Sequence, residues 1–367
     1  MQVGILGFAR SGKTTIFNAA TRGSATVSPT GRGGGGKPNI GVAKMHDPRI
    51  DKLVEMHRAP KRVPAEVVYV DMPGAPEGFG KSVGITGELL NHLQKCDALM
   101  LVARAFDDPS VPNDREDVDP ARDIEAMVTE VVFSDLAILE KRLQRVKDSF
   151  KGAKATERDT LEKEQALLIR IQGELEAGKP VKDQALTADE RKALQGYKFL
   201  TDKPLVAIAN IGEEALPRVQ AVEEQLRAKF EARGIGTAAV CGKLEMELAQ
   251  MAPEEEAEFR RSMGAGESGL NRMVRLCYDA LGQLTFFTAG PKEVHAWTVA
   301  RGSDAFAAAG RIHSDIQRGF IRAEIMGYED FVACGSEAAA RKRGLLRQEG
   351  KTYIVQDGDI LNVLFSI

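Results

Sequence analysis

The sequence has few cysteines and no long apolar run, and both shortages exclude classes of protein. Its four cysteines stand far apart and form no C-x-x-C pair: Cys96, Cys241, Cys277 and Cys334. This spacing disfavours a zinc site and offers no disulfide framework. No apolar segment approaches the roughly 18 to 20 residues that a membrane helix needs, and the chain opens on a strand pattern instead of a signal peptide. We therefore expect a cytoplasmic protein with reduced thiols and no membrane contact.

The sequence also lacks an excess of charge of either sign. Lys and Arg total 50 and Asp and Glu total 53, which gives a formal net charge of −3. This balance favours neither non-specific nucleic-acid binding by the whole surface nor an acidic tail. With 367 residues and 43% hydrophobic content, the chain can fill the cores of two or three globular domains. Any contact with a polyanion must therefore be local.

Four apolar segments have the composition of buried strands, and helical patterns separate most of them. They are residues 1–6, 65–74, 97–106 and 203–212. Beta-branched and other apolar residues fill them almost throughout, which is typical of strands covered on both faces of a parallel sheet. The alternation predicts a doubly wound, mostly parallel α/β domain over residues 1–118 and 202–282.

A long segment rich in Glu, Lys, Arg, Leu and Gln, residues 119–201, interrupts this domain. Its apolar residues recur at alternating steps of three and four, with a break near residues 151–156. They are Leu136, Leu139, Leu143, Val146 and Phe150 before the break, and Leu161, Leu168, Ile171 and Leu175 after it. The spacing predicts two antiparallel helices that form a coiled-coil arm. A pair of surface helices packed on the main domain also fits the pattern.

The C-terminal residues 283–367 follow an amphipathic helical pattern at 267–282 and differ in character from the rest. They contain several strand-like runs, and the sequence QDGD at 356–359 indicates a turn between the last two strands. We expect a small α+β domain here. Its basic and acidic residues are balanced, so its charge does not mark it as a nucleic-acid domain.

The sequence GFARSGKTT has the G-x-x-x-x-G-K-[ST] spacing of a phosphate-binding loop. Its glycines permit a tight curl that turns backbone N–H groups onto phosphate oxygens, and the helix that follows adds its dipole. Lys13 is predicted to reach the β and γ phosphates, and the Thr14 hydroxyl to bind Mg²⁺. We expect nine residues to line the nucleotide: Gly7, Phe8, Ala9, Arg10, Ser11, Gly12, Lys13, Thr14 and Thr15. An ordinary glycine-rich turn is the alternative.

A carboxylate and a glycine end the second apolar segment in the order D-x-x-G. Asp71 is predicted to hold the magnesium shell through water, and the Gly74 N–H to sense the γ phosphate. The motif alone is weak, because Asp and Gly are common turn residues. Its position at a strand end and downstream of a phosphate loop makes it more specific.

The fourth apolar segment ends in N-x-x-E, at the position where a base-reading loop is expected. A guanine-specific site of this class has N-K-x-D, whose Asp accepts hydrogen bonds from guanine. Here Ile211 replaces the lysine and Glu213 is one methylene longer, so guanine recognition is weakened. Asn210 can pair with the N6 and N7 edge of adenine. A helix N-cap formed by Asn210, with Glu213 at its third position, explains the same residues.

With these motifs in place, the chain resembles the YchF/Obg-like ATPase family of P-loop proteins. The resemblance rests on N-x-x-E and on segments spread over most of residues 119–367, among them ESGLNRMVRLCYDALGQLTFFTAGPKEVHAWTV, GRIHSDIQRGFIRAEI and YIVQDGDI. It implies a G-type nucleotide domain with an inserted coiled-coil arm, and a C-terminal TGS domain of β-grasp type from about Gln283. It also implies slow ATP hydrolysis and an association with the ribosome.

The N-terminal third departs from the family pattern at two places. The family usually has Asn at the fourth loop position, where this chain has Arg10, and Thr in switch I, where this chain has glycines within residues 31–37. An Asn there can hold a monovalent cation beside the phosphates, and a guanidinium can supply that charge itself. We therefore assign a catalytic role to Arg10 together with Lys13 and Gly74. An arginine that points to solvent is the alternative.

The residue after D-x-x-G is Ala75, where many GTPases place a glutamine that orients water. A methyl group cannot orient water, so turnover is expected to be slow. Lys81 and His92 are candidates to assist, and each is otherwise read as a surface residue.

We therefore expect an ATP-binding, Mg²⁺-dependent P-loop NTPase that hydrolyses ATP slowly and acts as a nucleotide-controlled switch. The expected partner is the ribosome or one of its subunits, and RNA is a further candidate. A GTPase of the same fold is one alternative, since Glu213 can accept from guanine. A nucleotide-gated binding module with little catalysis is another, suggested by Ala75 and the missing switch threonine. A small-molecule kinase fits poorly, because D-x-x-G and N-x-x-E belong to switch proteins.

Overall fold

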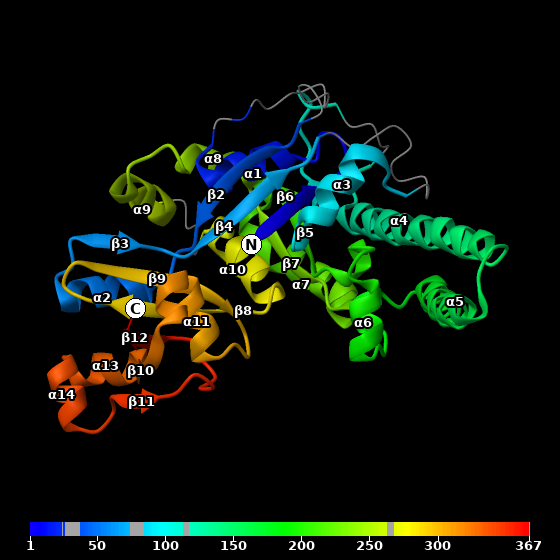
Figure 1. Ribbon diagram of the computed structural model, residues 1–367. Coiled ribbons are helices and arrows are strands. Elements are labelled where there is room, and N and C mark those ends of the chain that lie inside the picture. Colours follow the sequence, from blue (N-terminus) through cyan, green and yellow to red (C-terminus); the bar gives the residue numbers. More distant parts are fainter. Residues whose placement is uncertain (24, 26–36, 74–83, 113–116, 263–267, 367) are drawn as a thin grey trace. The chain divides into compact units, whose positions relative to one another are not determined.

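The computed structural model describes all residues except 24, 26–36, 74–83, 113–116, 263–267 and 367 (Figure 1). The chain divides into two compact units. The first contains Met1–Gly41 and Val68–Met273, and the second contains Val42–Val67 and Val274–Ile367. A six-stranded sheet lies at the centre of each unit.

The sheet of the first unit has the strand order β2-β4-β1-β5-β6-β7. Its strands are β1 (Gln2–Leu6), β2 (Asn39–Lys44), β4 (Glu66–Asp71), β5 (Ala98–Ala105), β6 (Leu205–Ile211) and β7 (Gly236–Val240). The pairs β1–β4, β1–β5, β5–β6 and β6–β7 are all parallel. Every residue of β6 is buried, as expected for a strand covered on both faces. The predicted α/β class is confirmed, and β2 and β7 are strands that the sequence patterns did not reveal.

Helices cover this sheet with apolar side chains. One face packs against α3 (Gly87–Lys95), the first half of α4 (Pro120–Ser149) and α7 (Val219–Phe230), with Leu93, Met127 and Phe230 fully buried. The helix α1 (Lys13–Thr21) packs against α8 (Gly242–Leu248). Further helices are η4 (Glu213–Arg218), η5 (Glu231–Arg233), α9 (Pro253–Ser262) and α10 (Gly269–Ala280). Within the described part of the chain, no helix is long and apolar enough to cross a membrane.

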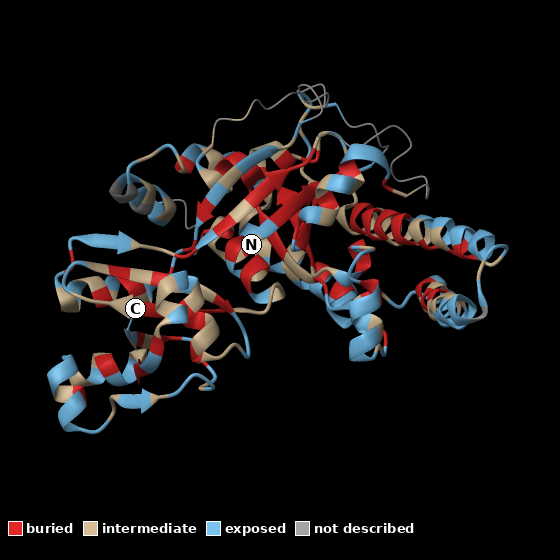
Figure 2. Cartoon of the chain, viewed as in Figure 1, coloured by how far each residue is buried: buried red, intermediate tan, exposed pale blue. Residues whose placement is uncertain are grey.

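The two halves of helix α4 pack against different parts of the first unit, and Figure 2 shows that the burial of its residues changes from one half to the other. Asp119 caps its start by accepting from the Arg122 N–H at 2.9 Å, and Pro120 suits the first turn. The second half of α4 packs against α5 (Ala155–Glu176) through Leu139, Leu143, Val146, Leu168, Ile171 and Leu175. The predicted helical insertion is therefore confirmed, and only the distal half of α4 belongs to an arm.

Short elements close the base of the arm: η2 (Val181–Asp183), α6 (Ala188–Leu194) and η3 (Leu200–Asp202). Asp135 of α4 is fully buried and accepts from the N–H groups of Leu200 at 2.8 Å and Thr201 at 2.7 Å. Burial raises the pKa of Asp135 to about 6, although these hydrogen bonds oppose the rise. A buried carboxylate thus fixes α4 to the segment that leads into β6.

The sheet of the second unit has the strand order β11-β10-β12-β8-β9-β3. Its strands are β3 (Lys61–Val63), β8 (Gln283–Ala289), β9 (Glu293–Ala300), β10 (Phe320–Gly327), β11 (Arg347–Glu349) and β12 (Asp359–Phe365). Its helices are α2 (Pro48–His57), α11 (Ala305–Ile312), α12 (Ser314–Arg318), α13 (Tyr328–Cys334) and α14 (Glu337–Lys342). Phe286, Ala308 and Ile325 lie in its core with no exposure. The expected C-terminal α+β domain is confirmed.

One detail of this domain was predicted wrongly. The residues before the QDGD turn do not form a strand that continues into β12, and Ile354 makes only an isolated bridge with Asp304. The backbone here bonds to another loop, because Val355 N–H donates to Ser303 O and Ala305 N–H donates to Tyr353 O. The turn itself is held by Asp359, whose Oδ2 accepts from the Gln356 N–H at 2.9 Å.

Residues 42–67, which we name the strap, complete the second unit although they lie far from it in sequence. The strand β3 pairs in parallel with β9, with Lys61 opposite Glu293 and Val63 opposite His295. The helix α2 packs against β8 and β9. These residues were predicted to belong to the nucleotide domain, because nothing local in them indicates a partner more than 200 residues away.

Candidate nucleotide-binding site

The phosphate-binding loop connects β1 to α1, and its glycines are required by the geometry. Gly12 has a φ of 87°, and a Cβ added there would lie 2.0 Å from Asn210 Nδ2. A Cβ at Gly7 would lie 2.5 Å from the Val102 carbonyl oxygen. Arg10 also has a positive φ, 61°, which is uncommon for a residue other than glycine. The loop is thus curled and packed against β5 and β6, as a phosphate cradle requires.

Lys13 is buried at the start of α1, and its ammonium group folds over the loop. Its Nζ donates to the carbonyl oxygens of Gly7 at 2.8 Å and Phe8 at 3.0 Å. Burial lowers the pKa of Lys13 to about 8, and the charge of Asp71 opposes this change. The cation is therefore positioned over the phosphate loop and is poorly solvated, so an anionic ligand would stabilise it.

The polar groups that could hold a metal ion lie around Asp71. Its Oδ2 accepts from the Thr14 hydroxyl at 2.8 Å and from Asn39 Nδ2 at 3.1 Å. Its Oδ1 is buried and has no hydrogen-bond partner in the described structure. Burial raises the pKa of this carboxyl, while Asn39, Thr14 and Lys13 oppose the rise. A buried carboxylate oxygen left without a partner suits a cation or its bound water.

These donors fit Mg²⁺ better than a metal held wholly by protein. Among the residues that the structure describes, no three His, Cys, Asp or Glu side chains gather into a metal site. Mg²⁺ keeps several of its waters and uses one or two carboxylates together with substrate phosphates. The Thr14 hydroxyl and the Asp71 carboxylate match that requirement. Asn39 was missed in the sequence, where its only signal is a polar residue at the start of what becomes β2.

The three residues of the expected base-reading segment, Asn210, Ile211 and Glu213, have different environments. The Asn210 side chain is buried, donates from Nδ2 to Ser11 O at 3.0 Å and accepts at Oδ1 from the Gly242 N–H at 3.0 Å. Ile211 lies in the hydrophobic core with 3% exposure. Glu213 is exposed and forms an ion pair of 3.4 Å with Lys243. Asn210 therefore ties the phosphate loop to the start of α8, and only Glu213 presents an exposed polar side chain.

Arg10 lies beside a second arginine, Arg104, which no sequence motif indicated. Its Nη1 donates to the Pro112 carbonyl at 3.4 Å, and Arg104 Nη1 donates to the same oxygen at 3.4 Å. Arg104 is buried and also donates to the carbonyls of Val111 at 2.9 Å and Phe106 at 3.1 Å. Arg104 thereby shapes the loop that provides Arg10 with an acceptor.

Only some of the remaining predicted residues lie in the part of the chain that the structure describes. The switch glycines, Gly74, Ala75 and Lys81 lie outside the described residues. His92 is partly buried in the last turn of α3, where its carbonyl accepts from Cys96 Sγ at 3.4 Å. Ala9 is exposed, and Phe8 packs against the core.

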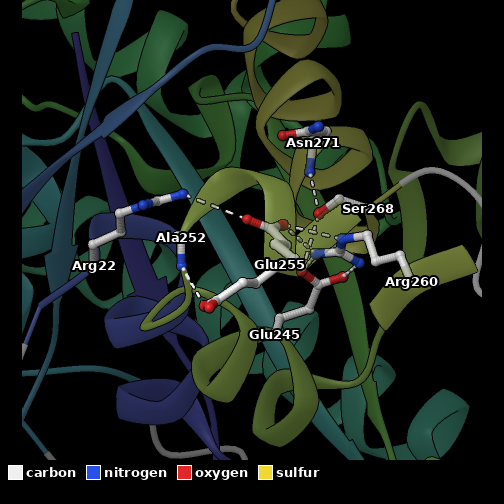
Figure 3. A network of polar contacts seen from close by, with 8 residues as sticks. Arg22, Glu245, Ala252, Glu255, Arg260, Ser268 and Asn271 are labelled. Atoms are coloured by element: carbon white, nitrogen blue, oxygen red, sulfur yellow. Dashed lines mark hydrogen bonds and ion pairs between the residues drawn. The ribbon is translucent and has the colours of Figure 1, made fainter. Parts of the chain in front are cut away.

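A buried polar network supports α8, the helix whose first residue meets Asn210 (Figure 3). Glu245 of α8 accepts from Arg260 Nη2 at 2.5 Å, from Ser268 Oγ at 3.0 Å and from the Gly269 N–H at 2.9 Å. Arg260 also binds Glu256 at 3.0 Å. The carboxylate is desolvated but fully bonded, so it fixes α8 to α9 and α10 without an uncompensated charge.

Two family models match the chain, one at each end. The family described as "50S ribosome-binding GTPase" matches residues 2–141. The YchF-GTPase_C family, described as "Protein of unknown function (DUF933)", matches residues 284–366.

Full-length relatives and a solved structure agree with these matches. The chain is 36% identical over 377 residues to the ribosome-binding ATPase YchF of Bacillus subtilis, covering 100% of both proteins. It is 34% identical over 381 residues to Obg-like ATPase 1 of Caenorhabditis elegans, covering 100% of this chain and 92% of that protein. The structure of the Schizosaccharomyces pombe YchF GTPase matches with a TM-score of 0.82 and 28% identity, covering 99% of this chain and 97% of that one. The chain belongs to the YchF/Obg-like family of P-loop ATPases.

Proposed function

We propose that this protein binds ATP with Mg²⁺, hydrolyses it slowly and uses the nucleotide state to control a ribosomal partner. The arrangement of Lys13, Thr14 and Asp71 carries the proposal. These residues place a desolvated ammonium, a hydroxyl and a carboxylate around the loop whose backbone N–H groups would cradle the phosphates.

Each residue has a distinct part in this reaction. Lys13 would leave its two carbonyl acceptors and neutralise charge on the β and γ phosphates. Thr14 and Asp71 would hold Mg²⁺, which neutralises the charge that develops on the phosphates. Arg10 would add a fixed positive charge at the loop. Ala75 cannot orient the attacking water, which supports slow turnover.

The preference for ATP is supported by the base-reading segment. The lysine of N-K-x-D is absent, and its position is occupied by Ile211 in the core. Glu213 forms an exposed ion pair with Lys243, which competes with guanine for the Glu213 carboxylate. The bacterial relatives are named as ATPases. The exposed Glu213 carboxylate favours GTP as the second candidate.

The switch is supported by the path of the chain. Asn39 binds the Asp71 carboxylate, and the strap begins three residues after it. The strap ends at residue 67, four residues before Asp71. A ligand at Asp71 would therefore act on both ends of a segment that belongs to the second unit. This is how we propose that the nucleotide reaches the C-terminal domain.

Titration of the purified protein with ATP and GTP tests the nucleotide assignment. We expect tighter ATP binding, and we expect Lys13→Ala to abolish it while the circular dichroism spectrum stays unchanged. Lys229→Ala is the matched control, because it removes the same charge from the exposed face of α7. Unchanged ATP affinity in Lys13→Ala contradicts the phosphate-loop assignment. A wild-type preference for GTP of tenfold, about 1.4 kcal/mol, contradicts the choice of ATP.

The partner is tested separately by incubating the ATP-loaded protein with purified ribosomal subunits and sedimenting the mixture. The relatives named as ribosome-binding support an expectation of co-sedimentation. Absence of co-sedimentation in both the ATP-bound and nucleotide-free states would refute this part of the proposal.

A further inference from the structure

A cavity of about 250 Å³ lies in the first unit where the helical arm meets the sheet, and we name it the arm-base cavity. Its walls come from α4, from residues 177–183 after α5, from residues 201–205 that lead into β6, and from residues 232–235 ahead of β7. Leu205 is the first residue of β6, whereas Asn210, which bonds to the phosphate loop, lies near the other end of this strand. The cavity is therefore at the edge of the sheet opposite the nucleotide-binding site.

The inner wall of the arm-base cavity is apolar. Val128 and Val131 of α4, Leu205 and Ile235 are all buried, and Val132 of α4 also lines the cavity. These side chains cannot hydrogen-bond to water, so water molecules against them would lose partners that they have in bulk solvent. The inner wall therefore suits a hydrocarbon group.

The outer part of the cavity is charged. It is lined by four cations and one acid: Lys179, Lys182, Lys203, Arg233 and Asp183. Two of the cations are already paired with carboxylates outside the lining, Lys179 with Glu174 at 2.7 Å and Arg233 with Glu125 at 2.6 Å. Asp183 balances one of the two cations that remain. The lining therefore has an excess of one positive charge.

Lys182 and Lys203 form no ion pair with any residue in the described part of the chain. Lys182 Nζ donates to the Gly234 carbonyl at 3.4 Å, which is a weak bond. Lys203 Nζ donates to the carbonyl oxygens of Gln94 at 3.2 Å and Cys96 at 2.5 Å. Burial lowers the pKa of Lys203, although nearby negative groups oppose this change. An anion in the cavity would therefore stabilise both ammonium groups.

The volume limits the ligand to a small molecule. Pockets that enclose a drug-sized ligand measure about 300 to 1,000 Å³, and the arm-base cavity is smaller. At roughly 30 Å³ for each water-sized group, it has room for about eight such groups. A monocarboxylate with about six carbon atoms has this size.

We propose that the arm-base cavity binds a small apolar molecule that carries one carboxylate. The hydrocarbon part lies against Val128, Val131 and Ile235, and the carboxylate lies at the Lys182 ammonium group. A neutral hydrocarbon would leave the excess positive charge without a partner, and an inorganic anion would leave the apolar wall facing water. A bound molecule contacts all four segments that line the cavity, so it joins the base of the arm to the sheet. It does not compete with ATP, because the nucleotide binds at the opposite edge.

Methyl NMR of the full-length protein, labelled at valine and leucine methyl groups, tests this site. Hexanoate is the probe, and hexanol is its neutral counterpart of the same length. We expect hexanoate to shift the methyl signals of Val128, Val131 and Val132 in a saturable way. Affinity should rise about fourfold for each methylene group added between butanoate and hexanoate. Shifts confined to methyl groups outside the cavity overturn the proposal.

The substitution Lys182→Gln tests the role of the charge. We expect it to weaken hexanoate binding roughly tenfold, as the loss of a hydrogen bond to a charged group requires, and to leave hexanol binding unchanged. Lys192→Gln is the matched control, because Lys192 is exposed on α6 and lies outside the lining. Equal weakening by both substitutions overturns the proposal. Wild-type protein that binds hexanol as tightly as hexanoate also overturns it.

The substitution Val132→Phe fills part of the cavity and tests the volume. We expect hexanoate binding to be lost while ATP affinity and the circular dichroism spectrum stay unchanged. If this variant does not fold, Lys182→Gln decides the matter alone. Unchanged hexanoate affinity in a folded Val132→Phe variant overturns the proposal. A wild-type protein that binds ATP but shows no hexanoate shifts overturns this inference and leaves the nucleotide assignment intact.

Discussion

Arg49 of the strap is predicted to stabilise the second unit far more than Arg62, another arginine of the same segment. Its guanidinium donates to Asp47 through Nε at 3.0 Å and Nη2 at 2.8 Å, and to Asp357 through Nη1 at 2.6 Å. It also lies 5.3 Å from the centre of the Phe287 ring. Burial lowers the pKa of Arg49, but the hydrogen bonds and charges of the two carboxylates outweigh burial and raise it above its ordinary value. One side chain thus joins the start of α2 to the turn that precedes β12.

The loss of stability expected for Arg49→Ala depends on the two carboxylates that would lose their partner. Asp47 is buried at 7% exposure and would lose its cation. Removing one partner of a buried pair costs about 3 to 5 kcal/mol. The Arg49 side chain is 25% exposed and Asp357 is 47% exposed, so solvent screens part of this interaction. We expect a loss of about 2 to 3 kcal/mol in the free energy of unfolding.

Urea denaturation followed by tryptophan fluorescence measures this loss. Trp297 is the single tryptophan of the chain and lies in β9, so its signal reports on the second unit. Arg62→Ala is the matched control, because Arg62 pairs with Asp51 at 2.7 Å but the two are 41% and 51% exposed. Such a surface pair is worth about 0 to 1 kcal/mol. Equal destabilisation by both substitutions would refute the role given to Arg49.

Further predictions concern the phosphate-binding loop, the helical arm, the Lys13 ammonium group and the positive charge of Arg10. Gly12→Ala should weaken ATP binding at least tenfold, since its methyl group would lie 2.0 Å from Asn210; titration checks this. Gly173→Ala, in open space on α5, should instead stabilise the protein by about 0.5 to 1 kcal/mol, measured by thermal unfolding. ATP affinity should fall as the pH rises through about 8, which is the pKa of Lys13 in the nucleotide-free protein. The bound phosphates keep this lysine protonated, so above that pH the protein must take up a proton when ATP binds. Calorimetry in buffers of different ionisation enthalpy detects that uptake. If Arg10 supplies a fixed cation, exchange of K⁺ for Na⁺ should leave hydrolysis unchanged, and strong activation by K⁺ would contradict this role.

The sequence predicted the features that depend on local composition. Continuous apolar runs identified β1, β4, β5 and β6, and the regular spacing of Leu139, Leu143 and Val146 identified the arm. Neither β3 nor β11 could be found in this way, because each has three residues and is mostly charged or polar. Such strands exist only because a neighbouring strand supplies their hydrogen bonds.

In the candidate site too, the sequence predicted what depends on residue type and missed what depends on contacts made in the fold. The residue types of the phosphate loop predict that it binds phosphate, since few other functions need glycines and a lysine at that spacing. The contacts of Asn39 and Arg104 depend on loops that meet only in the fold. Asn210 looked like a base reader by type, but its amide bonds to Ser11 and Gly242. A side chain's hydrogen-bonding capacity is visible in the sequence, and the groups that use it are not.

The position of the strap has a consequence for how the protein is synthesised. Lys61 of β3 bonds to Glu293 of β9, 232 residues later, and Arg49 bonds to Asp357, 308 residues later. At about 5 to 20 residues per second during translation, β3 waits roughly 10 to 50 seconds for its partner strand. Throughout that time the side chains of Ile50 and Leu53, fully buried in the finished fold, have no β8 or β9 to cover them. A growing chain therefore leaves the apolar side chains of α2 without their packing partners from early in synthesis until the last domain emerges.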